Sequence, residues 1–317
     1  MRLVMPHERR FFSKILLFGE YSIIKDSMAL ATPYALFDGH LKFKSSPSRS
    51  SDNGNSQGNE FRAYAQHIEN LIEQKLLPVD IDINAFKFDI AQGLFFSSTI
   101  PQGFGLGSSG ALVAAIYDRY VDKKDRERLR ADILKLKEIF ALLESHFHGA
   151  SSGIDPLISY LNTSILLRSK DEISAVKFPD YTEGVGGIFL LNTGRSRRTE
   201  PLVNLFLEKC NSNLEFSNLC VNRLAPITNS CINSFLEKDT ATLYQAFRDI
   251  SDFQLSHFTP MIPKLFRDIW ERGLKSECYS LKLCGAGGGG FLLGITKNFS
   301  DTFSMLSKIE VRSLFKF

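Results

Sequence analysis

The sequence predicts an α+β protein that is built from two lobes. The chain has 317 residues, which is long enough for two lobes that each bury a sizeable core. Short apolar runs typical of buried strands and apolar repeats typical of helices both occur along it. Strand-like runs become frequent after Asn162. We therefore expect a boundary near residues 170–185, with an N-terminal lobe over 1–175 and a C-terminal lobe over 176–317.

The N-terminal third predicts strands, a loop and a helix, in that order. Residues 14–24 contain two short apolar runs separated by Gly19 and Glu20, as in buried strands joined at a turn or bulge. Residues 45–59 form a low-complexity segment. Because such a composition can bury almost nothing, we expect a mobile loop there. A helix is predicted at about residues 63–75.

The clearest helical pattern covers residues 125–148. Its apolar residues recur at spacings of three and four, which gives the helix one apolar face. Glu144 lies at the edge of that face, so its carboxylate can be partly enclosed and still reach a cleft. Helical patterns also alternate up to about residue 272, and the strands predicted before them lie within 164–169, 173–178 and 186–194.

A glycine-rich stretch opens the helix that the apolar run Ala111–Ile116 predicts. Residues 101–110 read PQGFGLGSSG, and their glycines let the backbone approach a ligand closely. Ser108 and Ser109 are good N-cap residues for the helix. Free N–H groups and the positive end of the helix dipole would then form an anion site, for which phosphate is the usual ligand. The alternative is a flexible turn that leads into a core helix. The stretch is neither a P-loop, since it lacks the lysine, nor a dinucleotide fingerprint, since its spacing differs.

Four segments in this chain resemble, in the same order, the motifs of the GHMP kinases, and the mevalonate kinases most of all. The glycine-rich stretch is the central one. The others read KILLFGEYSII at residues 14–24, ESHFHGASSGID at 144–155 and KLCGAGGGGFLLGI at 282–295. The resemblance implies a two-lobed GHMP kinase fold. Its N-lobe would be a ribosomal-protein-like α/β domain and its C-lobe a ferredoxin-like α+β sandwich, with the active site between the lobes.

The resemblance also implies ATP-dependent phosphorylation of the primary hydroxyl of mevalonate, a step of isoprenoid biosynthesis. Phosphoryl transfer needs an aligned acceptor, neutralised phosphates and a group that takes the acceptor's proton. Asp155 is the expected base, because the first turn of a helix capped by Ser151 or Ser152 favours an ionised carboxylate. Lys14 matches a lysine near the acceptor hydroxyl, where a cation would lower the hydroxyl's pKa. The alternatives are an Asp that only offsets the helix dipole and an exposed Lys at a strand end.

The same resemblance makes Glu144 a Mg²⁺ ligand. The second ligand would be the hydroxyl of Ser109 or, as a weaker candidate, of Ser108. This set suits Mg²⁺, which usually takes one or two protein oxygens together with waters and phosphates. The alternatives are a solvated Glu at the helix edge and serines that only cap a helix.

The motifs also indicate residues that would contact the two substrates. For ATP these are Gly103, Gly105, Leu106, Gly107, Ser108, Ser109, Gly287 and Gly288. For the acceptor they are Glu20, Tyr21, Thr199, Gly285 and Ala286. His148 is interpreted as a helix-terminal residue that bonds nearby carbonyls. The chain departs from the mevalonate kinase pattern at Tyr21, where His is frequent, at Gly110, where Ala is usual, and at Cys284, where Thr is common.

Bulk properties limit the kinds of partner and the location. A formal net charge of +3 gives no broad basic field, so no nucleic-acid partner is expected. Five cysteines without a CxxC pair predict reduced thiols rather than a disulfide framework or a zinc site. The charged start of the chain and the lack of a long apolar run predict no signal peptide and no membrane span. We expect a cytoplasmic monomer or homodimer that binds ATP and mevalonate.

Two other functions remain open from the sequence. A GHMP kinase for another small alcohol, such as phosphomevalonate, a sugar or homoserine, would use the same chemistry. A catalytically silent nucleotide-binding regulator would be favoured by loss of Lys14, Glu144 or Asp155, but all three are present. A mevalonate diphosphate decarboxylase is disfavoured, because its signature lacks the block from Glu144 to Asp155.

Overall fold

The structure is a computed structural model that describes residues 9–44, 53–169, 171–196 and 200–317. It divides into two compact units, each made of segments that lie far apart in the sequence. Unit 1 consists of Met1–Lys14, Pro33–Pro101 and Gly107–Thr163. Unit 2 consists of Ile15–Thr32, Gln102–Leu106 and Ser164–Phe317. Strands β1 (Phe11–Phe18) and β2 (Ala29–Phe43) contribute residues to both units.

A close strand pair forms part of unit 1. Its members are β2 and β3 (Leu94–Ser98), which run antiparallel with Gly39 opposite Ser98. A Cβ at Gly39 would lie 2.2 Å from the ring of Phe96. The glycine therefore lets an aromatic ring of one strand lie directly over the backbone of the next.

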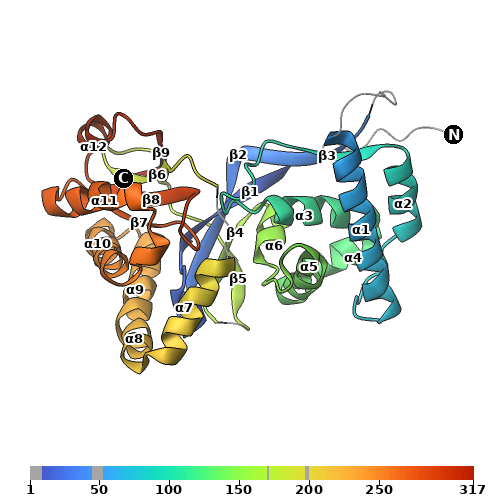
Figure 1. Cartoon of the computed structure of the whole chain (residues 1–317), viewed down its shortest axis with the longest axis horizontal. Helices are drawn as coiled ribbons and strands as arrows, with labels where there is room; N and C mark the ends of the chain where they lie inside the picture. The colour runs from blue at the N-terminus through green and yellow to red at the C-terminus, as the bar shows by residue number, and fades with distance from the viewer. Residues whose placement is uncertain (1–8, 45–52, 170, 197–199) are drawn as a thin grey trace. The chain divides into compact units, whose positions relative to one another are not determined.

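The helices of unit 1 share an aromatic core. Figure 1 shows α3, α5 and α6 side by side, and all three contact one another. The ring of Tyr117 on α3 meets the rings of Phe140 on α5 and Tyr160 on α6 at centroid distances of 4.9 and 5.0 Å. The helices of this unit are α1 (Asn53–Glu73), α2 (Ile83–Ala91), α3 (Ser108–Tyr120), α4 (Lys123–Arg130), α5 (Ile133–His148) and α6 (Ile154–Leu161).

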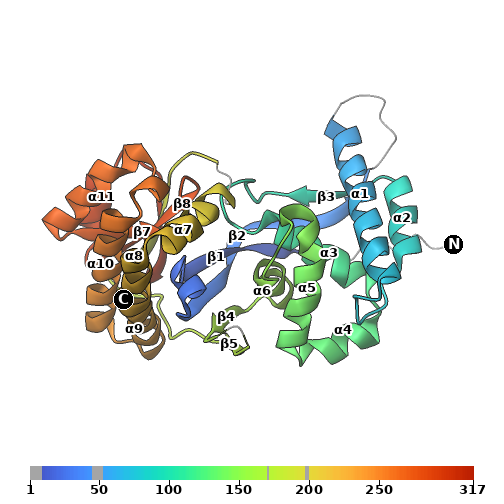
Figure 2. The ribbon, with the colours of Figure 1, turned by 60° about the horizontal axis from the view of Figure 1, so that its bottom comes forward.

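Two predictions about these helices are wrong in part. Residues 53–59, expected to be loop, form the first turns of α1, while residues 45–52 lie outside the described residues. The single helix expected over 125–148 is in fact α4 and α5, which meet at an angle in Figure 2. The break occurs where Asp132 caps α5 by accepting a hydrogen bond from the N–H of Lys135. A continuous apolar repeat does not reveal such a break, whereas a cap residue does.

The second predicted strand of residues 14–24 is also wrong. β1 ends at Phe18, and Ser22–Lys25 form a 3₁₀ helix. Between them Gly19 and Tyr21 take positive φ values of 109° and 61°, which an extended strand does not allow. A Cβ at Gly19 would lie 2.4 Å from the Cβ of Ala29. This turn therefore needs glycine in order to pack against the start of β2.

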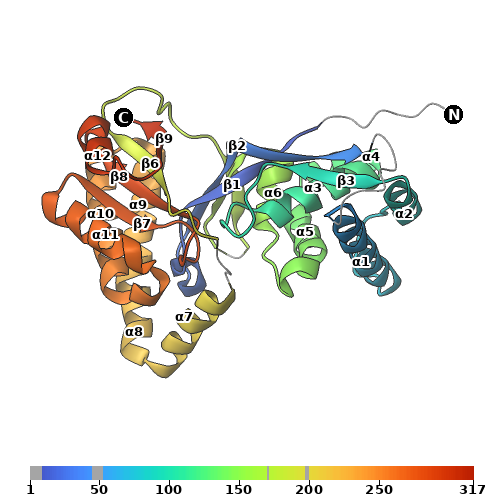
Figure 3. The same cartoon turned by 45° about the horizontal axis from the view of Figure 1, so that its top comes forward.

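Unit 2 contains a four-stranded antiparallel sheet in the order β7-β8-β6-β9. Every residue of β7 and β8 is buried, including the polar side chains of Ser280 and Lys282 in β7. Figure 3 shows helices α10 and α11 beside this sheet, where both contact β7. The four strands are β6 (Gly187–Asn192), β7 (Tyr279–Leu283), β8 (Phe291–Thr296) and β9 (Val311–Lys316).

Further elements complete unit 2. The strands predicted at 164–169, 173–178 and 186–194 are confirmed as β4 (Ser164–Leu167), β5 (Ile173–Val176) and β6, and β4 pairs antiparallel with β5. The helices are α7 (Glu200–Ser212), α8 (Leu214–Leu219), a π-helix (Cys220–Leu224), α9 (Ala225–Glu237), α10 (Thr240–His257), a 3₁₀ helix (Thr259–Met261), α11 (Lys264–Ser276) and α12 (Phe299–Met305).

One buried side chain of α11 is a natural marker of unit 2. Trp270 is the chain's only tryptophan and is fully buried. Its indole N–H donates a hydrogen bond to the hydroxyl of Ser251 on α10, at 2.8 Å. This bond satisfies the ring's polar atom and joins the two helices.

The structure also tests the predictions about membrane-spanning helices and about the cysteine thiols. In the part of the chain that the structure describes, no helix is both long and apolar enough to cross a bilayer. The five cysteines are free thiols, and all but Cys278 are buried.

Candidate active site

The glycine-rich stretch leads into α3 through three residues with left-handed backbone. Gly103, Gly105 and Gly107 have φ values of 76°, 74° and 74°, which side chains strongly disfavour. Helix α3 begins at Ser108, and Gly107 is its N-cap residue. The prediction that Ser108 and Ser109 cap the helix is therefore wrong. Both serines lie in the first turn, where a hydroxyl can make contacts other than capping.

Two glycines allow the start of α3 to lie against a lysine and an aspartate of unit 1. A Cβ at Gly110 would lie 2.7 Å from the backbone carbon of Asp155. A Cβ on Gly107 would lie 3.0 Å from Cγ of Lys14 and 3.3 Å from Oδ2 of Asp155. Glycine at position 110 therefore allows α3 and α6 to pack this closely.

Lys14 and Asp155 form an ion pair at this point. The distance between Lys14 Nζ and Asp155 Oδ1 is 3.0 Å. The Asp155 side chain is 30% exposed, so a small molecule can reach its carboxylate. As predicted, Asp155 lies in the first turn of a helix, α6. The N-terminal dipole of that helix favours a negative charge there.

The predicted serine cap of α6 is wrong. Gly153 is the N-cap residue, with a φ of 72°. A Cβ on Gly153 would lie 2.1 Å from the carbonyl oxygen of Lys137 on α5, so only glycine fits. Ser151 and Ser152 lie just before the helix. Their hydroxyl oxygens accept hydrogen bonds from the N–H groups of Gly153 and Ile154, respectively.

Glu144 is a buried carboxylate bound by hydroxyl groups. Its side chain accepts hydrogen bonds from Ser109, at 3.0 Å, and from Ser151. The residue is only 4% exposed. Burial, and secondly the nearby charge of Asp155, raise the pKa of Glu144 to about 7. The charge of Lys14 lowers the pKa of Glu144 less than the other influences change it, and Lys14 forms its ion pair with Asp155.

These surroundings fit a magnesium ion. A buried carboxylate whose pKa stays raised despite its hydrogen bonds and the charge of Lys14 is stabilised by a bound cation. The adjacent hydroxyl of Ser109 supplies a second oxygen ligand, and Mg²⁺ commonly takes no more than two from protein. Glu144 and Ser109 are thus the residues that could hold Mg²⁺.

His148 is a site residue that the sequence interpretation missed. Its Nε2 atom lies 3.0 Å from the hydroxyl oxygen of Ser109, whereas nearby carbonyls were the expected partners. His148 lies four residues after Glu144 on α5, so both side chains are on the same helix face. This spacing is the signal that could have found it.

The third glycine motif forms a tight loop in unit 2. The N–H groups of Gly288 and Gly290 donate to the carbonyl oxygens of Met261 and Arg195. A Cβ on Gly290 would lie 2.5 Å from the carbonyl oxygen of Phe104. This loop therefore packs on residues 102–106, the part of the first glycine stretch that belongs to unit 2.

Two residues that were expected to contact the acceptor make polar contacts with other residues of unit 2. The carboxylate of Glu20 is 5% exposed and lies 2.7 Å from Lys282 Nζ. Tyr21 donates its hydroxyl proton to the carbonyl oxygen of Ala286. Its ring also packs against Phe206, at a centroid distance of 4.8 Å. Thr199, a third expected acceptor residue, lies outside the described residues.

Comparison with known proteins shows which family this chain resembles. Residues 63–163 match the family model for the GHMP kinases N terminal domain. The chain is therefore similar to GHMP kinases. It is similar to the mevalonate kinase of Dictyostelium discoideum, with 23% identity over 246 residues that cover 70% of this chain. The match spans 62% of the length of that relative.

Solved structures of GHMP kinases share the fold of this chain. The L. major mevalonate kinase in complex with R-mevalonate has a TM-score of 0.64 at 17% identity, over 96% of this chain and 91% of the other. The Streptococcus pneumoniae phosphomevalonate kinase has a TM-score of 0.62 at 16% identity, over 97% and 100%. The Lactococcus lactis galactokinase complexed with galactose has a TM-score of 0.63 at 15% identity, over 98% and 93%. The predicted α+β GHMP kinase fold is confirmed.

Within this GHMP kinase fold, the predicted site residues lie in two clusters. Lys14, Ser109, Glu144 and Asp155 come together in unit 1, along with Gly107 and Ser108. The other expected ligand-contact residues are in unit 2, namely Gly103, Gly105, Leu106, Glu20, Tyr21, Gly285, Ala286, Gly287 and Gly288.

Proposed function

We propose that this chain transfers the γ-phosphoryl group of ATP to the primary hydroxyl of mevalonate. The observation that carries the proposal is the cluster in unit 1. There the Lys14–Asp155 ion pair and the Ser109–Glu144 hydrogen bond both lie at the start of α3. A base, a cation, a metal-binding pair and a helix N-terminus are the parts that phosphoryl transfer requires.

Asp155 is the proposed general base. It accepts the proton of the acceptor hydroxyl while the acceptor oxygen bonds to the γ-phosphorus. The bond from that phosphorus to the bridging oxygen breaks at the same time, and ADP leaves with the electron pair. The exposed fraction of the Asp155 side chain allows the proton to pass to water afterwards.

Lys14 has two proposed tasks. Its ammonium holds the Asp155 carboxylate through Oδ1, which leaves Oδ2 to accept the proton. It also places a positive charge where negative charge develops on the transferring group.

Ser109 and Glu144 are the residues that would hold Mg²⁺. Bound Mg²⁺ would neutralise charge on the β- and γ-phosphates. The glycine-rich backbone before α3 has little side-chain bulk, and its N–H groups and the helix dipole suit the same phosphates.

ADP release in a coupled assay tests the proposal. We expect Mg-ATP turnover with mevalonate and none with phosphomevalonate, galactose or homoserine. Asp155→Asn should lower kcat by on the order of 100-fold or more, as expected for a general base, while nucleotide binding persists. Asp80→Asn, which changes an exposed aspartate of unit 1, is the matched control and should retain turnover. Unchanged turnover in Asp155→Asn would exclude Asp155 as the base.

A kinase for another small alcohol is the second candidate function. The fold comparison favours keeping it, because a galactokinase and a phosphomevalonate kinase match this chain about as well as a mevalonate kinase does. Turnover on a different acceptor in the same assay would support it. Bound ATP without turnover on any acceptor would instead support a silent nucleotide-binding regulator.

Cellular context is part of the same proposal. An enzyme with this activity would act in isoprenoid biosynthesis, in the cytoplasm, as a monomer or homodimer. Cell fractionation and sedimentation of the purified chain would test the location and the assembly state.

A further inference from the structure

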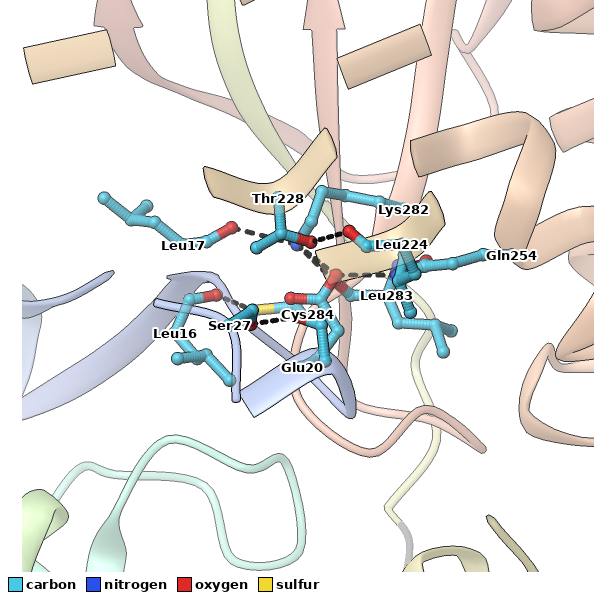
Figure 4. A network of polar contacts seen from close by, with 11 residues as sticks. Leu16, Leu17, Glu20, Ser27, Leu224, Thr228, Gln254, Lys282, Leu283 and Cys284 are labelled. Carbon is cyan, nitrogen blue, oxygen red and sulfur yellow. Dashed lines mark hydrogen bonds and ion pairs between the residues drawn. The ribbon is translucent and has the colours of Figure 1, made fainter. Parts of the chain in front are cut away.

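Lys282 carries a buried ammonium group in the interior of unit 2. The residue has no solvent exposure. Its Nζ atom donates to the carbonyl oxygens of Leu17, at 2.9 Å, and Leu283, at 2.7 Å. A third contact, of 2.7 Å, joins it to Oε1 of Glu20. Because an ammonium has three donors, each of them has an oxygen partner here, as Figure 4 shows.

Gln254 of α10 closes a ring around this ammonium. Its side-chain N–H donates to the same Glu20 oxygen, at 2.7 Å. Its carbonyl oxygen accepts the backbone N–H of Leu283, at 2.8 Å. Both polar backbone atoms of Leu283 are therefore held by these side chains. We call Glu20, Gln254 and Lys282 the Lys282 clamp (Figure 4).

Burying the charged groups of the Lys282 clamp in a protein core has a large free-energy cost. Removing two charges from water costs several kcal/mol per ion before their attraction is counted. Burial raises the pKa of Glu20 even though Lys282 lowers it in part, and Oε2 of Glu20 is buried without a hydrogen-bond partner among the described residues. Apolar side chains would give similar stability, so the clamp is better explained by the geometry that it fixes.

The clamp fixes the position of the residues just before the third glycine loop. Leu283 lies two residues before Gly285, where the loop of residues 285–290 begins. The thiol of Cys284 donates to the carbonyl oxygen of Leu16, at 3.7 Å, and Tyr21 donates to Ala286. Residues 282–286 are thus joined to residues 16–21 at Lys282, Cys284 and Ala286. The contact at Lys282 is the one that buries charged groups.

We propose that the Lys282 clamp positions the glycine loop of residues 285–290 for its ligands, and that Glu20 acts through Lys282 rather than by touching the acceptor. This inference rests on the proposed kinase function, in which that loop contacts ATP and the acceptor. Lys282 and Gln254 thereby become positioning residues, which the motif comparison did not assign.

Hydrogen exchange tests the clamp independently of catalysis. Gln254→Met removes both of the Gln254 hydrogen bonds at similar volume, and the double variant Glu20→Gln, Lys282→Met removes the charges together. In the full chain we expect the amides of Gly288 and Gly290 to exchange at least about tenfold faster in both variants. Tyr181→Phe is the control, since it removes a different buried hydrogen bond of unit 2, to the carbonyl of Phe235. Unchanged exchange at the two glycines, or equal acceleration in Tyr181→Phe, would overturn the proposal.

Kinetics provide the second readout. A misplaced loop should raise KM for ATP or the acceptor by about tenfold or more in the folded variants, because a shift of about 1 Å in a positioning group can cost on the order of 100-fold. A purely structural role would lower the active fraction and leave KM unchanged. If the wild-type chain has no turnover, the proposed function fails, whereas the exchange experiment still decides the clamp.

Discussion

Among single residues, Glu144 has the environment that most affects the response to pH. Burial and the charge of Asp155 raise its pKa from 4.5 to about 7. The folded state therefore binds this proton more tightly than the unfolded state. It follows that the metal-free protein loses stability as the pH rises from about 4.5 through about 7, and regains it on acidification.

Glu144→Gln should remove this pH dependence. Without metal at pH 8, we expect the variant to unfold at a higher temperature than the wild type, by the equivalent of about 3 kcal/mol, since the pKa rises from 4.5 to about 7 and each unit of pKa shift corresponds to about 1.4 kcal/mol. At pH 4 the two proteins should unfold alike. Thermal unfolding in EDTA at both pH values measures the difference. Glu138→Gln changes a largely exposed neighbour on α5 and should show no such dependence.

The sequence motifs predicted site residues that do lie in contact. They missed residues such as Gln254, which hold other site residues in place. Lys14 with Asp155, and Ser109 with Glu144, are in contact, although their roles stay predictions. Gln254 could not be found in this way, because it lies 234 positions from its partner Glu20. Pattern and propensity describe local structure, whereas a buried ion pair depends on how distant segments fold together.

At the scale of elements, the close approach of α3 and α6 is the feature on which the site depends. Gly110→Ala should weaken it, because the added Cβ would meet backbone atoms of Asp155 and Pro156, both at 2.7 Å. We expect a loss of about 1–3 kcal/mol of stability, as is typical of overpacking, together with reduced turnover. Chemical denaturation and the ADP assay measure the two effects.

Gly58→Ala is the matched control on α1. No atom lies within 4 Å of the Cβ that this change adds. The substitution should stabilise the helix by about 0.5–1 kcal/mol, since glycine is a poor residue in a helix interior. Destabilisation of similar size in both variants would show that packing between α3 and α6 is not the cause.

The elements also show which boundaries the sequence patterns predicted and which they missed. The strands β4, β5 and β6 follow short apolar runs bounded by polar residues and were predicted. The break before α5 was missed, because the apolar spacing continues across Asp132. The start of α1 was missed because its first residues, from Asn53 to Asn59, have a composition typical of loops.

At the scale of the whole molecule, neither unit is one continuous stretch of chain. The chain passes between them within β1, within β2, on either side of residues 102–106 and once more between Thr163 and Ser164. The predicted division at residues 175 and 176 stays a prediction about lobes.

The single indole at Trp270 makes unit 2 visible to fluorescence. Because this ring is fully buried, its emission should be blue-shifted in the native protein and move to longer wavelength when water reaches it. Far-UV circular dichroism, in contrast, averages over the helices of both units. Gly110→Ala, a change in unit 1, should therefore lower the melting midpoint seen by dichroism more than the midpoint seen by emission. Equal shifts would mean that the two units melt as one cooperative body, and no added dye is needed to tell the two outcomes apart.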